Sequence, residues 1–157
     1  MSGLSYYVQI INKVGGLLSC IGSGYIVQDV LRSPFRRTES IYHRTMLGLS
    51  TTDIMSSFFT FILGSWPMPT GAYRWAAGNM VTCDIAAFIG LTGTMGSMIY
   101  NCSLATYYVL QLKYNLSDRR MRAIEKWLHI VPLSVALMFS ITILSAKMLG
   151  PGIGHCW

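Results

Sequence analysis

Apolar residues run along this sequence in four long stretches, each separated from the next by a short polar segment. The stretches cover about residues 4–31, 45–66, 80–113 and 123–149. As a helix rising about 1.5 Å per residue, each is long enough to cross a hydrocarbon layer of about 30 Å. We therefore predict an all-α, polytopic membrane bundle of four transmembrane helices, forming one domain over residues 1–157.

The third stretch is the one around which the others are expected to pack. It carries no charged residue over the 28 positions from 85 to 112. Glycine recurs at every third position, at Gly90, Gly93 and Gly96, and polar Ser97 and Asn101 follow. Small residues let helix backbones approach closely in a membrane, and polar groups at that depth need protein partners. These features predict a central helix that contacts several others.

The number and the placement of charged residues indicate the class of protein and its membrane topology. Hydrophobic residues make up 52% of the chain and charged residues 11%, against about 25% charged in soluble domains, which indicates an integral membrane protein. Nine of the twelve Lys and Arg residues fall in two short segments: Arg32, Arg36, Arg37 and Arg44, then Lys113, Arg119, Arg120, Arg122 and Lys126. The positive-inside rule makes loops 32–44 and 114–122 cytoplasmic, so the N-terminus, loop 67–79 and tail 150–157 are outside. This clustering argues against nucleic-acid binding.

Asp53 is the most informative single residue. It lies eight residues into the second stretch, and burying a carboxylate there costs at least about 2.5–3.5 kcal/mol. Asp53 must therefore face protein or water, either as a functional polar hub or as a protonated group in a packing network. Lys13 of the first stretch either snorkels outward or faces the bundle interior. Glu125 and His129 are spaced to pair at the cytoplasmic edge.

The four cysteines divide by depth. Four crossings place Cys83 and Cys156 on the outer side, whereas Cys20 and Cys102 lie inside spans. A Cys83–Cys156 disulfide would close a loop of over seventy residues, an entropic effect of about 4 kcal/mol, and would draw the last loop across the bundle. The alternative is two unpaired thiols. The spacing matches no metal site.

Together these features resemble the first half of a seven-helix G-protein-coupled receptor of the broadly rhodopsin-like kind, in a divergent form. Leu49 and Asp53 match the family's Leu-x-x-x-Asp in helix two. Cys83 and Cys156 match its disulfide between helix three and the loop after helix four, and Trp75 matches a Trp of the first outer loop.

Further positions both extend and limit the resemblance. Ser97 falls where the family completes a sodium and water site with the helix-two Asp. The family's Asp-Arg-Tyr at the inner end of helix three is replaced by Tyr107, Tyr108 and Val109. The central Trp of helix four is also absent, since Trp127 lies at the edge of its span.

The resemblance implies a function and its sites. The chain would be the four-helix N-terminal portion of a plasma-membrane receptor that senses an unknown small extracellular ligand and signals to a heterotrimeric G protein. It implies a polar hub at Asp53, Ser97 and Asn101, with sodium at Asp53 and Ser97. The cytoplasmic coupling surface would comprise Tyr107, Tyr108, Arg119, Arg120 and Arg122. No cofactor is expected.

Two other functions stay open. The chain is alternatively a complete four-span scaffold or adaptor that packs laterally against other membrane proteins. Less favoured is a transporter fragment with Asp53 and Lys13 along its path, because no internal symmetry is evident. An enzyme is not expected, since His43, His129 and His155 differ in depth or membrane side.

Overall fold

The computed structural model describes residues 3–33, 40–71, 75–152 and 155–156, and what it describes is helical. Helices make up most of the described residues, which contain no β-strand. The elements in chain order are α1 (Gly3–Arg32), α3 (Ile41–Ser56), the π-helix η1 (Ser57–Ile62), α4 (Met80–Leu112) and α5 (Asp118–Ser145).

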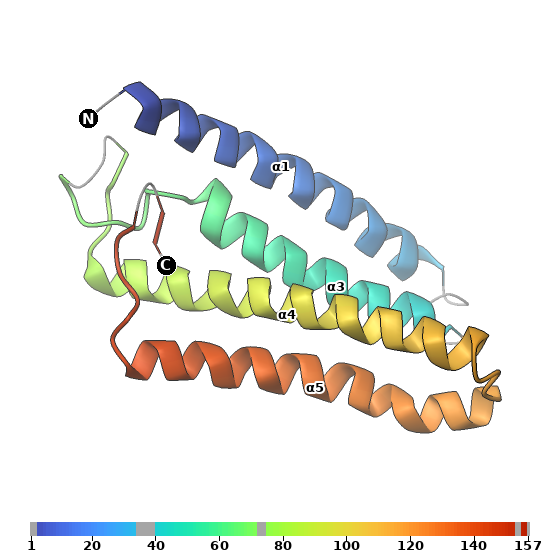
Figure 1. The fold of residues 1–157 in the computed structure, drawn as a ribbon. Helices are drawn as coiled ribbons and strands as arrows, with labels where there is room; N and C mark the ends of the chain where they lie inside the picture. The colour runs from blue at the N-terminus through green and yellow to red at the C-terminus, as the bar shows by residue number, and fades with distance from the viewer. Residues whose placement is uncertain (1–2, 34–39, 72–74, 153–154, 157) are drawn as a thin grey trace.

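The helices run antiparallel, side by side (Figure 1). α3 packs between α1 and α4, and α4 packs between α3 and α5, so α1 and α5 form the two flanks. The start of α1, the end of α5, residues 63–71 and 75–79, and Cys156 lie together at one end, which we call the disulfide end. The end of α1, the start of α3, the end of α4 and the start of α5 lie at the opposite end, which we call the basic end after its Arg and Lys residues.

Three of the helices suit a membrane. Tyr7–Arg32, Met80–Leu112 and Arg119–Ser145 are long and apolar enough to cross one, which indicates an integral membrane protein. α3 has 16 residues, fewer than a span requires by itself. The sequence predicted four crossings, and the structure shows three candidates.

The second and fourth helices begin earlier than predicted. α3 starts at Ile41 rather than residue 45, because Ser40 caps it and accepts a hydrogen bond from the His43 amide at 3.5 Å. α5 spans Asp118–Ser145 rather than 123–149, so its basic residues lie on helical turns instead of a loop. Arg, Met, Ala and Glu are strong helix formers, which explains this early start. Arg36 and Arg37 of the first basic segment lie outside the described residues.

The glycine residues of α4 bring its backbone almost into contact with that of α3. A Cβ atom added to Gly93 would lie 2.5 Å from the Ser56 amide nitrogen and 2.8 Å from the Thr52 carbonyl oxygen. Gly90 is placed in the same way against Thr60 of η1. The predicted central role of the third helix is confirmed, since α4 packs against α3, η1 and α5.

The apolar core is split between the two ends. At the disulfide end it contains Met68, Cys83, Ala87 and Cys156. At the basic end it contains Ile41, Met121 and Leu128. Between these clusters the contacts of α3 with its neighbours are made by small and hydroxyl-bearing residues around Asp53. The bundle is therefore polar at mid-height, where side-chain hydrogen bonds join its helices.

Candidate functional site

The Asp53 carboxylate joins three helices. The Ser97 hydroxyl of α4 donates to Oδ1 at 2.9 Å. From α1, the Ser23 hydroxyl donates to Oδ2 at 3.0 Å and that of Ser19 lies 3.4 Å from the same atom. Hydrogen bonds to an ionised carboxylate are stronger than those between neutral groups. A single side chain of α3 thus fixes the relative positions of α1 and α4.

Further hydroxyl groups extend this cluster toward η1. The Ser57 hydroxyl donates to the Ser19 oxygen at 2.9 Å, so Ser57, Ser19 and Asp53 form a chain. Ser56 and Thr94 lie 2.7 Å apart through their hydroxyl oxygens and tie α3 to α4 once more. The polar layer therefore reaches from Asp53 to the first residue of η1.

Asp53 also faces a groove of about 400 Å³ between α1 and the rod of α3 and η1. Its lining includes Asn12, Ser19 and Ser56 besides the carboxylate. Gly15 and Gly16 border the groove on α1. Gly15 has open space beside it, whereas a Cβ atom added to Gly16 would lie 2.6 Å from Phe61 Cβ, so Gly16 packs closely on η1. A carboxylate at mid-height of the bundle is consequently not sealed inside the four helices.

The donor set indicates what this site can hold. Carboxylate and hydroxyl oxygens are hard ligands of the kind that alkali and alkaline-earth cations prefer. Asp53 with Ser19, Ser23 and Ser97 supplies such oxygens from three helices, and the hydroxyl groups can rotate to turn their lone pairs inward. The described residues contain no cluster of three or more His, Cys, Asp or Glu side chains suited to a transition metal.

The predicted hub is only partly the observed one. Ser97 contacts Asp53 as its spacing implied. Asn101 does not, because it is exposed and its amide donates to the Ser97 carbonyl at 3.1 Å. The sequence reasoning missed Ser19 and did not assign Ser23 to the hub. Their spacing of four residues places both on one helix face, and that was the available signal.

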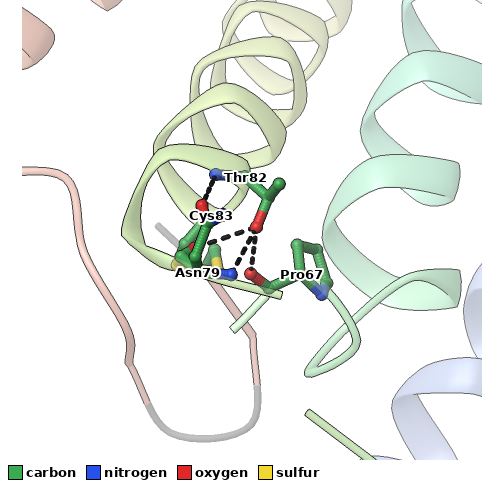
Figure 2. The surroundings of a disulfide bond; sticks show 5 residues. Pro67, Asn79, Thr82 and Cys83 are labelled. Atoms are coloured by element: carbon green, nitrogen blue, oxygen red, sulfur yellow. Dashed lines mark hydrogen bonds between the residues drawn. A yellow bond between two sulfur atoms is a disulfide. The ribbon is translucent and has the colours of Figure 1, made fainter. Parts of the chain in front are cut away.

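At the disulfide end, a disulfide joins the start of α4 to the tail that follows α5. Cys83, in the first turn of α4, is joined to Cys156, 73 residues later. Figure 2 shows how the start of α4 is fixed beside it: Asn79 Oδ1 accepts from the Thr82 amide at 2.9 Å, and the Thr82 hydroxyl donates to the Pro67 carbonyl at 2.8 Å. The capping box and the disulfide together hold the loop before α4 and the tail after α5 against one helix start.

The predicted coupling surface lies at the basic end. Tyr107 and Tyr108 both approach the Tyr42 ring, with centroids 6.3 Å and 5.9 Å away. Arg119, Arg120 and Arg122 are exposed on the first turns of α5. The structure therefore places aromatic and basic side chains at the same end, and the arginines are accessible.

Glu125 and His129, which the sequence spacing allows to pair, form no hydrogen bond with each other. Glu125 instead forms a bidentate ion pair with Arg44 of α3, in which Nη2 and Oε2 are 2.8 Å apart and Nε contacts Oε1. His129 Nδ1 lies 3.2 Å from the Tyr100 hydroxyl. Arg44 reaches Glu125 from another helix, whereas the spacing along the sequence indicates only which residues of α5 are neighbours.

Comparison of the chain with protein-family models, with curated proteins and with solved structures gives no match.

Proposed function

We propose that this chain forms helices one to four of a seven-helix receptor similar to G-protein-coupled receptors, located in the plasma membrane with its N-terminus outside. In the whole receptor, a small extracellular ligand would shift helix packing around Asp53, and cytoplasmic partners would detect the change at the basic end. The observation that carries this proposal is the Asp53 carboxylate, bonded to hydroxyl groups of α1 and α4 and facing an open groove.

The proposal includes a fourth crossing, made by α3 and η1. The 16 residues of α3 continue without interruption into the 6 residues of η1, which gives a helical rod of roughly 30 Å. That length matches the hydrocarbon thickness. The rod packs between α1 and α4, both of which are candidate spans, and this supports a fourth crossing at the same depth.

The orientation follows from charge. Arg44, Lys113 and the arginines of α5 lie at the basic end, and the positive-inside rule assigns that end to the cytoplasm. The disulfide end then faces the oxidising side, where a Cys83–Cys156 bond persists.

The open groove supports further helices. Lipid offers no hydrogen-bond partner, so a carboxylate with hydroxyl neighbours requires protein or water beside it. A groove of about 400 Å³, lined by Asn12, Ser19, Asp53 and Ser56, would accept a helix that carries polar side chains. In the family that the sequence resembles, such a helix belongs to the second half of the receptor.

The cytoplasmic partner is proposed to be a heterotrimeric G protein. Tyr107 and Tyr108 occupy the place of the family's Asp-Arg-Tyr, so Arg119, Arg120 and Arg122 would supply the positive charge at this surface. These arginines are exposed, as docking requires.

Two measurements test the proposal. The transcript read past codon 157 should encode three further apolar segments; a stop codon there would favour the four-span scaffold instead. In a protein without Cys20 and Cys102, single cysteines are introduced at one end or the other. On intact cells, an impermeant thiol reagent should label only the cysteines at the disulfide end. Labelling of both ends alike, or fewer than four crossings, would contradict the receptor.

A further inference from the structure

Helix α5 carries three basic residues on one face that points away from the bundle. Arg119, Arg122 and Lys126 are all exposed. At 100° per residue their positions lie within about 60° of one another around the helix, and they extend over about 10 Å along its axis. Because α5 forms a flank of the bundle, this face is not covered by another described helix (Figure 1). We call these three residues the basic face of α5.

The positive charge of the basic face is not neutralised by Glu125. This carboxylate lies on the same turns of α5, three residues after Arg122, but both of its oxygens contact Arg44 of α3. Among the side chains that the structure describes, no carboxylate forms an ion pair with the basic face. Three exposed charges on one side of a helix are therefore available to an external anion.

The same face of α5 becomes apolar after Lys126. Exposed aliphatic residues follow at intervals of three or four, and their positions stay within about 40° of the direction of Arg119. They are Ile130, Leu133, Leu137, Ile141 and Leu144. Trp127, at the boundary between the basic and apolar parts, is 63% exposed, and Trp is typical of the membrane interface. One helix face thus presents positive charge at headgroup level and aliphatic side chains at hydrocarbon depth.

A groove between α3 and α5 adjoins this apolar part. It has a volume of about 690 Å³, and its lining includes Leu47 and Met55 of α3 and Leu133 of α5. Arg44 also lines the groove, so the groove begins at the level of the Arg44–Glu125 ion pair. Since Leu133 belongs to both the apolar face and the groove, the two surfaces are continuous.

We propose that this surface of α5 binds a phospholipid with an anionic headgroup. Arg119, Arg122 and Lys126 neutralise the headgroup and donate hydrogen bonds to its phosphate. One acyl chain lies along Ile130 and Leu133 and enters the adjoining groove. The site requires only that α5 crosses a membrane, so it does not depend on the proposed receptor function.

Binding can be measured with the purified chain in maltoside micelles. Phosphatidylglycerol should raise the thermal midpoint more than phosphatidylcholine with the same acyl chains, because phosphatidylcholine has no net charge. Replacing Arg119, Arg122 and Lys126 together by Gln should lower the apparent affinity for phosphatidylglycerol at least about tenfold. Sodium glycerophosphate, which has no acyl chain, should leave the midpoint unchanged. A rise as large as that with phosphatidylglycerol would assign the site to soluble anions and overturn the proposal.

A matched triple variant separates the basic face from the total charge of the chain. Arg32, Lys113 and Arg120 are exposed at the same end but do not belong to the basic face, since Arg120 lies about 100° from Arg119 around α5. Replacing these three residues by Gln removes the same charge and should preserve the preference for phosphatidylglycerol. Equal loss of preference in both triple variants would show an effect of net charge alone and would refute the site.

Single variants keep the test informative if a triple variant folds poorly. Arg122→Gln should bind phosphatidylglycerol about threefold or more weakly than the natural chain, whereas Arg120→Gln should bind it equally well. Arg122→Lys keeps the charge and should retain most of the binding. Equal affinities of Arg122→Gln, Arg120→Gln and the natural chain would contradict the proposed contact.

Discussion

Arg44 of α3 and Glu125 of α5 form a bidentate ion pair across 81 residues of sequence. Their side chains are 24% and 17% exposed, so both charges are largely shielded from solvent. The pair joins helices that otherwise contact each other little, because α4 lies between them. It fixes the spacing of these two helices at the basic end.

Breaking this pair should destabilise the bundle. Glu125→Gln is expected to lower the free energy of unfolding by about 1–3 kcal/mol, because it leaves the Arg44 charge partly buried without its carboxylate. Unfolding in mixed micelles measures the change. The reversed pair, Arg44→Glu with Glu125→Arg, should recover part of the loss. Arg119→Gln alters an exposed arginine of α5 and should have little effect; a loss as large as that of Glu125→Gln would argue against the pair.

The Asp53 cluster should respond to sodium. Sodium chloride is expected to raise the thermal midpoint above that in N-methylglucamine chloride, since the oxygens around Asp53 suit a hard cation. Asp53→Asn should abolish the difference while it preserves the shape of the side chain. Asp29→Asn makes the same charge change on the exposed side of α1 and should keep the difference in thermal midpoint between the two salts. A sodium effect that survives Asp53→Asn would place the cation elsewhere.

Gly93 should tolerate no side chain. A Cβ atom there would meet the backbone of Ser56 and Thr52, and backbone atoms move less easily than side-chain ends. We expect Gly93→Ala to lower the free energy of unfolding by about 1–3 kcal/mol. Gly15→Ala is the matched control, because nothing lies within 4 Å of a Cβ at that position. It should be neutral or stabilising, since alanine favours a helix over glycine.

Loss of the disulfide should release the tail. Cys83→Ser is expected to cost about 4 kcal/mol, the loop-closure entropy of a link over 73 residues. Protease should then cut near residue 150 much faster than in the natural chain, with the helices still intact. Cys102→Ser changes an exposed free cysteine and serves as the control. Equal cutting rates in all three proteins would show that the link does not hold the tail.

The sequence predicts well those features that need only composition and spacing. Long apolar stretches give α1 and α4 within one residue of their observed ends, because helix length in a membrane is set by the hydrocarbon. Glycine every third residue on α4 marks a packed face, and the structure places that face against α3 and η1.

Features that depend on the facing helix were not predictable in the same way. Ser19 and Asn101 are both polar residues in apolar stretches, yet only Ser19 contacts Asp53. The difference arises from helix rotation, which packing sets and spacing does not. Glu125 likewise had a plausible neighbour on its own helix, and its actual partner Arg44 comes from α3.

The wide turns of η1 determine the direction in which the backbone carbonyls and side chains at its end point. Phe58 accepts from the Leu63 amide five residues on, so this segment carries more residues per turn than the α-helix before it. Removing one residue between 57 and 62 would convert it to an α-helical segment of nearly the same total rotation, so the residues beyond it would keep their direction. Removing one residue from α3 has no such compensation, since it would turn Ile62 by about 100° and carry its carbonyl away from Lys13, whose ammonium donates to it.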